Sequence, residues 1–323
     1  MMVTPESNRP GLEESACFLV RKITGGKMVE AHEIKIGIMT FKFLVTLSTG
    51  QKYIVRFYPR SRSFVVRYEP DIIGRCQAAG LPAPEVICDS RNGPRTELEY
   101  MIYPFINGTS LSEVYSSLEE AARMKIADQL VPLIAKISEI ALEGFGELLD
   151  GQRAKLNSWS EFLEQTCHTG IVSARRYGLF SERDICNLES LLPELTSLPP
   201  LQSGRLVWGD ISLENLIVEK DGSIAGILDF EGALSGDHLV NLGFCHARCY
   251  GTGFFEALIR AWPERFSEDQ QRNIKLYSLL RALRLAKFAH LPLPTGVPSD
   301  RIINVLPGFG PALYDLLDTS ESS

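Results

Sequence analysis

The stretch that decides the fold runs Leu206-Val-Trp-Gly-Asp-Ile-Ser-Leu-Glu-Asn-Leu-Ile-Val-Glu-Lys-Asp-Gly-Ser-Ile-Ala-Gly-Ile-Leu-Asp-Phe-Glu231. Within it, residues 216–218 and 224–228 are short apolar runs with β-branched side chains, a pattern typical of strands. The dipeptide Asp221-Gly222 separates the two runs and is favoured in two-residue type I′ turns. The stretch therefore predicts an antiparallel hairpin.

The register of this hairpin decides which polar side chains meet at its open end. A two-residue turn places Asn215 opposite Leu228 and Glu214 opposite Asp229. That register brings Asn215 and Asp229 together beyond the apolar pairs. Asp210 and Asn215 have the D-x-x-x-x-N spacing of a kinase catalytic loop. We therefore expect the side chains of Asp210, Asn215 and Asp229 to converge on one point.

These residue types suit phosphoryl transfer. A carboxylate such as Asp210 can orient a hydroxyl group and accept its proton. Mg²⁺ takes oxygen ligands, so Asn215 and Asp229 are the candidate metal ligands beside nucleotide phosphates. The alternative is a surface hairpin whose Asp and Asn side chains only cap turns. The joint spacing of the three residues favours the phosphoryl-transfer site.

The same segment resembles the core of a known family. It contains Trp208-Gly209-Asp210, Asn215, Asp229-Phe230-Glu231 and Gly236-Asp237. In this pattern it resembles the aminoglycoside phosphotransferase (APH) family, whose fold is similar to that of protein kinases. The family usually has His at the position of Trp208 and Asp at the position of Asn241. The resemblance extends over nearly the whole chain, although only residues 206–237 are specific.

The resemblance implies an α+β, bilobal, protein-kinase-like fold. A small β-rich N-terminal lobe that binds nucleotide is expected over residues 1–103, and a larger, mainly helical, catalytic and substrate-binding lobe over residues 104–323. Apolar periodicity in the first lobe predicts a helix over 12–23 and antiparallel strands over 29–36, 40–47 and 51–58. In the second lobe, helices are predicted to begin at Ser117 and Ser158 and to span 181–195, 254–266, 267–289 and 298–318.

Nucleotide phosphates have candidate partners in the first lobe. The hairpin between the first two strands carries Gly37 and Thr40, and glycine lets backbone N–H groups approach phosphates closely. The resemblance assigns Arg56 to the α and β phosphates and Glu69 as its acidic partner, whereas the alternative is a strand-edge arginine and a capping glutamate. Because Pro70 follows it, Glu69 is expected to begin its helix.

An apolar run over residues 98–106, which ends in Asn107-Gly108, is similar to the family's hinge between lobes. There the resemblance implies adenine recognition through backbone groups. Tyr103 and Phe105 are the expected contributors, with Ile102 near the back of the pocket. The alternative for these three residues is ordinary core packing.

Composition restricts the classes of partner. The 323 residues include 33 Lys+Arg and 40 Asp+Glu, a net charge of -7, which argues against nucleic acid and anionic membranes and favours cationic small molecules. Seven cysteines without C-x-x-C spacing are expected to be reduced. The first ten residues lack an apolar core and no apolar stretch is long enough for a membrane span, so a cytoplasmic location is expected. An acidic acceptor cleft is expected from Glu231, Asp237, Asp315 and Asp318.

The sequence therefore predicts an O-phosphotransferase that uses ATP, with GTP left open, and Mg²⁺. The resemblance implies that the acceptor is a hydroxyl of an aminoglycoside-like antibiotic, as in antibiotic resistance, or of a related small molecule. A choline- or sugar-type kinase is the alternative within this chemistry, since Asp229-Phe-Glu231 also resembles the choline kinase version. A non-catalytic nucleotide-binding regulator is the alternative from another class. The acceptor and the oligomeric state have no motif in the sequence.

Overall fold

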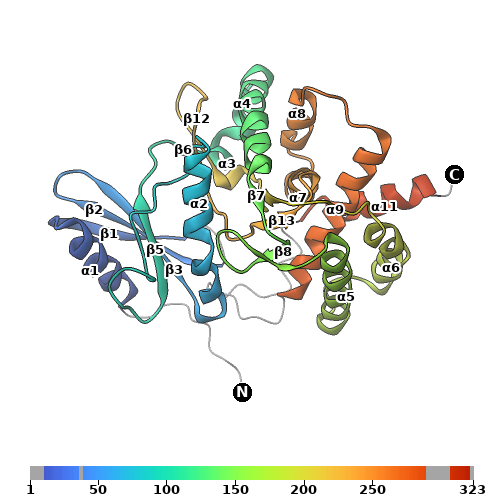
Figure 1. The fold of residues 1–323 in the computed structure, drawn as a ribbon. Helices are drawn as coiled ribbons and strands as arrows, with labels where there is room; N and C mark the ends of the chain where they lie inside the picture. The colour runs from blue at the N-terminus through green and yellow to red at the C-terminus, as the bar shows by residue number, and fades with distance from the viewer. Residues whose placement is uncertain (1–10, 36–38, 289–305, 321–323) are drawn as a thin grey trace.

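The N-terminal part of the chain is a five-stranded antiparallel sheet with a helix on each face. The structure is a computed structural model that describes residues 11–35, 39–288 and 306–320. The sheet has the order β1 (Met28–Ile34), β2 (Phe41–Leu47), β3 (Lys52–Tyr58), β5 (Glu99–Pro104) and β4 (Cys88–Asp89). Helix α1 (Leu12–Thr24) packs on one face, and α2 (Glu69–Ala78), which follows the 3₁₀ helix η1 (Arg60–Arg67), lies on the other (Figure 1).

Strand alternation divides the apolar side chains of this sheet between two cores. Val55 and Phe57 of β3 lie in the core beneath α1, whereas Ile54 and Tyr58 lie in the core shared with α2. Successive side chains of a strand point to opposite faces, so β3 is buried on both sides as a central strand. The predicted N-terminal helix and the three antiparallel strands are confirmed.

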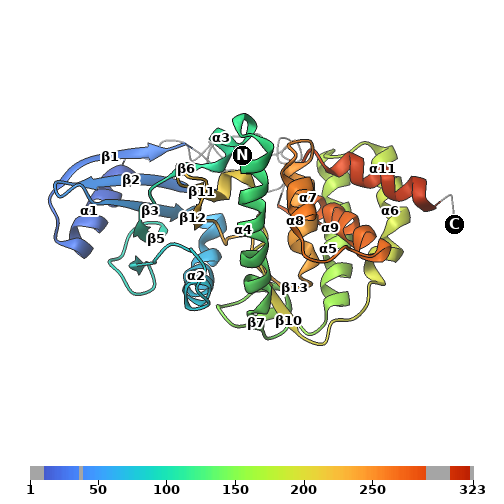
Figure 2. The same ribbon diagram turned by 90° about the horizontal axis from the view of Figure 1, so that it is seen from above.

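The C-terminal part is mainly helical. Its central helix, α9 (Glu268–Lys287), contacts α5 (Trp159–Tyr177), α7 (Leu239–Cys249), α11 (Phe309–Ser320) and α6 (Glu182–Thr196). Helices α4 (Glu120–Glu139) and α8 (Phe254–Ala261) pack against each other. Figure 2 shows α4 between the N-terminal sheet and this helical group.

Three helix boundaries differ from the predicted ones. The helix predicted from Ser117 begins at Glu120, because Ser117 belongs to a short 3₁₀ helix, η2 (Tyr115–Ser117). Helix α8 ends at Ala261 rather than at Phe266, because Trp262 precedes a proline and adopts an extended backbone. Helix α11 begins at Phe309, and residues 298–305 of the predicted helix lie outside the described residues.

The central hairpin has the predicted register. Strands β11 (Leu216–Val218) and β12 (Ile224–Ile227) pair antiparallel, with Leu216 opposite Ile227. Beyond that pair, the backbone N–H of Leu228 donates to the carbonyl of Asn215 at 2.8 Å. Asn215 is therefore opposite Leu228, as the sequence predicts.

The turn of the hairpin is longer than predicted. The N–H of Glu219 donates to the carbonyl of Ser223 at 2.9 Å, so three residues rather than two lie between these positions. A register shift between Ile217 and Val218 compensates for the extra residue. Gly222 has a φ of 81°, and glycine adopts this left-handed conformation at the end of three-residue turns. The predicted two-residue turn is therefore wrong, although the bulge preserves the register.

Two further sheets hold the hairpin in place. Strand β6 (Thr109–Ser110) follows the N-terminal sheet and pairs with β11. A second five-stranded sheet pairs β10 (Gly204–Val207) with β13 (Leu234–Gly236) and is completed by β7 (Ala141–Leu142), β8 (Phe145–Leu148) and β9 (Ala154–Leu156). Strand β10 ends just before Trp208, and β13 begins just after Gly232-Ala233. The pairing of β10 with β13 therefore places the loop before the hairpin, residues 208–215, beside the loop after it, residues 228–233.

The described chain shows two further general features. None of its helices combines the length and the apolar character needed to cross a membrane. The seven cysteines form no disulfide, and four of them are buried: Cys76, Cys167, Cys245 and Cys249.

Candidate active site

A cavity of about 760 Å³ opens between the N-terminal sheet and the central hairpin. Its volume lies within the range of roughly 300–1,000 Å³ common for small-molecule sites. On the side of the sheet its lining includes Thr40, just before β2, and Arg56 of β3, and the loops beside the hairpin contribute Asp210, Asn215 and Asp229. The three side chains that were predicted to converge therefore line one cavity.

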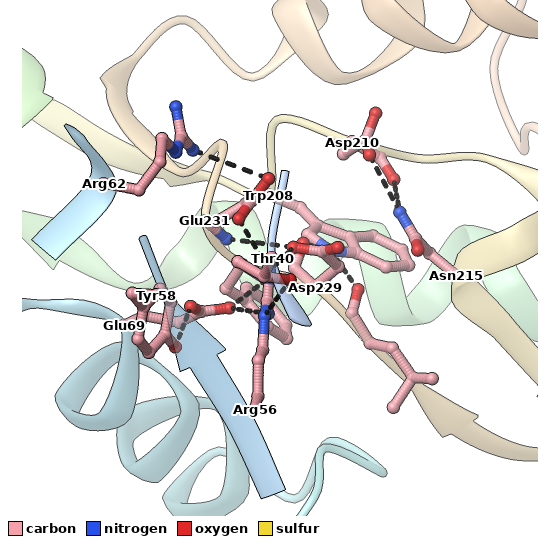
Figure 3. A network of polar contacts seen from close by, with 12 residues as sticks. Thr40, Arg56, Tyr58, Arg62, Glu69, Trp208, Asp210, Asn215, Asp229 and Glu231 are labelled. Atoms are coloured by element: carbon pink, nitrogen blue, oxygen red, sulfur yellow. Dashed lines mark hydrogen bonds and ion pairs between the residues drawn. The ribbon is translucent and has the colours of Figure 1, made fainter. Parts of the chain in front are cut away.

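Arg56 of β3 is the centre of a buried polar network (Figure 3). Its Nε donates to Thr40 Oγ1 at 3.0 Å and its Nη1 to Glu69 Oε1 at 2.8 Å. Its Nη2 donates to Asp229 Oδ1 at 3.0 Å and to Glu231 Oε2 at 2.6 Å. Burial lowers the pKa of Arg56, but the three carboxylates outweigh burial and raise this pKa well above its ordinary value. The predicted Arg56–Glu69 pair thus forms within a larger network.

Glu69 links helix α2 to the loop that carries Asp229. It begins α2, as its position before a proline predicts, and it is completely buried. Besides the bond from Arg56, its carboxylate accepts hydrogen bonds from Tyr58 Oη at 2.6 Å and from the backbone N–H of Phe230 at 3.0 Å. Three donors therefore fix the Glu69 carboxylate next to the Asp229 loop.

Asp229 has an unusual backbone conformation. Its φ is 64°, and within the described residues it is the one residue other than glycine with a positive φ. Such a conformation costs of the order of 1–3 kcal/mol and persists where the surroundings enforce it, most often at functional sites. Burial alone would raise the pKa of Asp229, but the charges of Arg56 and Lys42 outweigh it and lower this pKa to about 2. Asp229 is therefore a carboxylate at neutral pH.

Asp210 and Asn215 are joined directly. Asn215 Nδ2 donates to Asp210 Oδ2 at 3.0 Å and to the Asp210 carbonyl at 2.9 Å (Figure 3). The other carboxylate oxygen of Asp210 accepts a hydrogen bond from Arg281 Nη2 of helix α9 at 2.8 Å. Both oxygens of the Asp210 side chain are thus oriented by donors.

Trp208 connects the two loops of the hairpin. Its indole Nε1 donates to the carbonyls of Leu228 at 3.0 Å and Asp229 at 3.1 Å, and its ring stacks on Phe230. Its own backbone N–H donates to Asn241 Oδ1 at 3.0 Å. The two departures from the usual family pattern therefore occupy supporting positions, where Trp208 supplies a ring donor and Asn241 an acceptor.

Replacing Trp208 by phenylalanine should keep the stacking and remove the ring donor. Two carbonyl oxygens then lose their partner, and an unmatched buried polar group costs about 1–3 kcal/mol. We expect urea denaturation to show a loss of stability of about this size. Nucleotide affinity with Mg²⁺ should also fall, since the same bonds hold the Asp229 loop.

The matched control for this substitution is Trp159→Phe. Trp159 is also fully buried, and its Nε1 donates to Tyr277 Oη at 3.3 Å away from the cavity. Trp159→Phe should lower stability and leave nucleotide affinity at the parent value. Equal nucleotide affinity in the two variants would contradict the support that we attribute to Trp208.

Some of the residues predicted to contact the nucleotide line the cavity, and others do not. Thr40, Tyr103 and Phe105 line the cavity. Ile102 does not, and the prediction that it lies at the back of the pocket is wrong. Ile102 and Tyr103 are successive residues of β5, so their side chains point to opposite faces, and Ile102 is buried in the core beneath α1. Gly37 lies outside the described residues.

The predicted acidic cleft is wrong. Of the four acidic residues, Glu231 lines the cavity, whereas the other three do not. Asp237 accepts hydrogen bonds from Tyr277 Oη at 2.8 Å and from the backbone N–H of Leu239 at 2.9 Å. Asp315 and Asp318 lie on the distant helix α11, where Asp315 pairs with Lys275.

Five arginines that no motif in the sequence indicates also line the cavity: Arg62, Arg67, Arg248, Arg281 and Arg284. Arg281 and Arg284 are three residues apart in α9, a spacing that places two side chains on one face of a helix. This spacing is the only hint in the sequence that Arg281 and Arg284 act together, and it does not indicate which surface or cavity they face.

Comparison with known proteins agrees with this geometry. The profile described as the phosphotransferase enzyme family (APH) matches residues 32–275. A thermostable mutant of aminoglycoside phosphotransferase APH(4)-Ia, in a ternary complex with AMP-PNP and hygromycin B, is similar in structure, with a TM-score of 0.69, 17% identity and coverage of 97% of this chain and 100% of that chain. The gentamicin complex of APH(2")-IIa has a TM-score of 0.64, 15% identity and coverage of 98% and 97%.

A third similar structure is the GDP complex of aminoglycoside 2'-phosphotransferase-IIIa, with a TM-score of 0.64, 13% identity and coverage of 96% of this chain and 99% of that chain. At these identities the likeness establishes the fold. The α+β, protein-kinase-like fold predicted from the sequence is therefore confirmed.

Proposed function

The chain belongs to the phosphotransferase enzyme family and is a phosphotransferase with a hydroxyl acceptor, and from this premise we propose that it transfers the γ-phosphate of ATP, with Mg²⁺, to a small molecule. One observation carries the proposal: Asp210, Asn215 and Asp229 line a single cavity into which Arg56 also projects. Phosphoryl transfer requires little covalent chemistry from a protein, so catalysis depends on such positioning and on charge.

We assign the nucleotide to the part of the cavity beside the N-terminal sheet. Thr40 and Arg56 would face its phosphates, and Tyr103 and Phe105 its base. Residues 1–103 would then form the nucleotide-binding lobe and residues 104–323 the catalytic and substrate-binding lobe. The AMP-PNP and GDP complexes of the similar structures support a purine nucleotide, and competition between ATP and GTP would determine the preference.

The residues at the hairpin fit a hard cation such as Mg²⁺. Asn215 donates through its amide nitrogen and Asp229 accepts through Oδ1, so the amide oxygen of Asn215 and the Oδ2 of Asp229 are the atoms that we assign to the metal. Oxygen ligands are those that Mg²⁺ prefers, and the low pKa of Asp229 keeps this carboxylate charged. When bound, the ion would neutralise negative charge on the nucleotide phosphates.

We assign Asp210 as the base. Its carboxylate is oriented by Asn215 on one oxygen and by Arg281 on the other. The acceptor oxygen would form the new P–O bond while the bond from the γ-phosphorus to ADP breaks, and the hydroxyl proton would pass to Asp210. The intact set of Asp210, Asn215 and Asp229 favours turnover over a purely regulatory nucleotide-binding role.

Two classes of acceptor are candidates. The hygromycin B and gentamicin complexes of the similar structures support an aminoglycoside-like acceptor, and a choline- or sugar-type acceptor is the second candidate. Incubation with γ-labelled ATP across hydroxylated antibiotics and metabolites tests the function. Label appearing in no acceptor, and no ADP formed, would refute it.

Replacing Asp229 by alanine should abolish the dependence of nucleotide binding on Mg²⁺ and abolish turnover. The substitution removes the charged ligand that we assign to the metal and leaves one N–H donor of Arg56 Nη2 available to phosphates. Titration calorimetry with and without Mg²⁺ should therefore give one nucleotide affinity for the variant and two for the parent. Asp221→Ala at the exposed tip of the same hairpin is the control and should retain the dependence. A variant that keeps the parent's Mg²⁺ response would place the ion elsewhere.

A further inference from the structure

The lining of the cavity has an excess of positive charge. It contains eight basic and six acidic residues, although the chain as a whole carries a net charge of -7. Five of the eight basic residues are arginines of three separate elements: Arg62 and Arg67 of η1, Arg248 of α7, and Arg281 and Arg284 of α9. Segments far apart in the sequence thus bring like charges to one cavity, in a protein that is acidic overall.

Three of these guanidinium groups are buried with few partners. Arg281 bonds to Asp210, Arg284 Nη1 donates to the carbonyl of Gly232 at 3.3 Å, and Arg62 Nη2 lies 3.5 Å from Glu231 Oε1. Arg62, Arg281 and Arg284 are each less than a tenth exposed, and their Nε atoms have no hydrogen-bond partner among the described residues. A guanidinium has five N–H donors, so each of the three keeps donors on its terminal nitrogens for a ligand.

Electrostatics separates Arg281 and Arg284 from Arg56, which bonds to three carboxylates. Burial, together with the charges of Arg284 and Arg248 and against the opposing charge of Asp210, lowers the pKa of Arg281 to about 10. Burial also lowers the pKa of Arg284, against the opposing charge of Glu147. Burial acts to lower the pKa of Arg62 as well, but neighbouring charges, chiefly that of Glu231, outweigh it and raise this pKa. For Arg56 the carboxylates outweigh burial and the pKa rises. The protein therefore supplies enough negative charge for Arg56 and too little for Arg281 and Arg284.

We propose, resting on the function proposed above, that the acceptor carries a carboxylate or phosphate group, which Arg62, Arg281 and Arg284 bind beside its reacting hydroxyl. The planar fork of a guanidinium matches both of these anions. Arg62 is also held in place, since its guanidinium lies over the rings of Phe64 at 5.6 Å and Phe288 at 5.7 Å. Such a preordered donor loses little freedom when it binds an anion.

The anionic group belongs to the acceptor rather than to the nucleotide. The cavity has separate basic residues for nucleotide phosphates, Arg56 and Lys42, which are cross-strand neighbours in the N-terminal sheet. Arg281, in contrast, comes from α9 and bonds directly to Asp210, the assigned base. A ligand whose hydroxyl reaches Asp210 is therefore also close to Arg281.

The test uses ligands that differ in charge and share a hydroxylated six-carbon frame. The protein is first saturated with AMP-PNP and Mg²⁺, so that the nucleotide phosphates already occupy their positions. Gluconate, glucose 6-phosphate, glucose and glucosamine are then titrated by calorimetry, with hygromycin B as a larger cation. We expect at least one of the two anions to bind about tenfold or more tightly than glucose, because each charge-assisted bond contributes strongly. Comparing gluconate with glucose 6-phosphate distinguishes carboxylate from phosphate.

Variants connect the binding to the arginines. Arg284→Gln and, independently, Arg62→Gln should each lower the affinity for the bound anion by about tenfold, and Arg284→Lys should recover part of the loss. Arg123→Gln is the matched control. Arg123 also has a buried Nε without a partner in the described chain and lies over an aromatic ring, that of Tyr115, but it does not line the cavity. It should bind the anion like the parent.

Three outcomes would overturn the inference: binding of neither anion, tighter binding of glucosamine or hygromycin B than of both anions, or anion affinity that is unchanged in both Arg284→Gln and Arg62→Gln. The proposed kinase function is judged by a separate readout. If AMP-PNP with Mg²⁺ does not bind to the parent, that function fails, whereas nucleotide binding together with a preference for cations refutes the anionic acceptor alone.

Discussion

Replacing Asp210 by asparagine is expected to lower kcat by about 10²–10⁴-fold, the usual effect of removing a general base. The amide cannot accept the proton of the acceptor hydroxyl, yet its oxygen can still accept the hydrogen bond that Arg281 Nη2 donates at 2.8 Å. The new amide nitrogen would face Asn215 Nδ2 in place of Oδ2, but Asn215 Nδ2 keeps its hydrogen bond to the backbone carbonyl of position 210 at 2.9 Å. We therefore expect the fold and the nucleotide affinity to survive. Single-turnover kinetics with γ-labelled ATP measures the rate, and titration calorimetry measures nucleotide binding.

The control for Asp210 is Glu219→Gln on the same hairpin. Glu219 is exposed and does not line the cavity, so the loss of its charge should leave kcat at the parent value. An Asp210→Asn variant with most of the parent's turnover would remove Asp210 from the role of base. Loss of nucleotide binding in that variant would instead point to a structural role for the carboxylate.

Replacing Arg56 by alanine is expected to lower the free energy of unfolding by about 3–5 kcal/mol, the typical cost of removing one partner of a buried ion pair. The substitution leaves Glu69, which is completely buried, without its cation. It also removes the counter-charge of Asp229 and Glu231. Urea or guanidinium denaturation measures the change, and ATP affinity should fall with it because the proposed phosphate ligand is lost.

Two comparisons isolate the buried pair. The double variant Arg56→Met with Glu69→Met should regain part of the lost stability, since it no longer buries an unpaired carboxylate. Arg175→Ala breaks the exposed pair with Glu189, whose side chains are 46% and 40% exposed, and should change stability little. If Arg56→Ala were no more destabilising than Arg175→Ala, the buried network would not hold the sheet to the Asp229 loop.

Short-range chemistry explains why much of the candidate site could be predicted. The spacing of Asp210 and Asn215 and the alternation around Asp221-Gly222 are local properties, so the hairpin register follows from them. The turn is one residue longer than predicted, but a register shift preserves the pairing of Leu216 with Ile227, because this apolar pair has to face the core.

The supporting residues were harder to predict because their roles depend on contacts between distant segments. Trp208 and Asn241 differ from the usual family residues, and the sequence does not indicate whether the loop is still held. The structure shows that it is, through bonds that span 20, 21 and 33 residues of the chain. Ile102 was misplaced for a related reason, since an apolar run does not by itself indicate which of its residues face a cavity and which face the core.

The sequence by itself determined the hairpin and its register, the three residues assigned to phosphoryl transfer and the start of α2, because each follows from local spacing or from the motif at 206–237. The Arg56–Glu69 pair followed from the resemblance to the family. Only the tertiary structure decided the charge of the cavity. Asp237 and Asp315 are paired elsewhere by Tyr277 and Lys275, while arginines of η1, α7 and α9 meet at the cavity. Net charge is a sum over the chain, whereas the charge that a ligand meets depends on which side chains the packing of distant helices buries together.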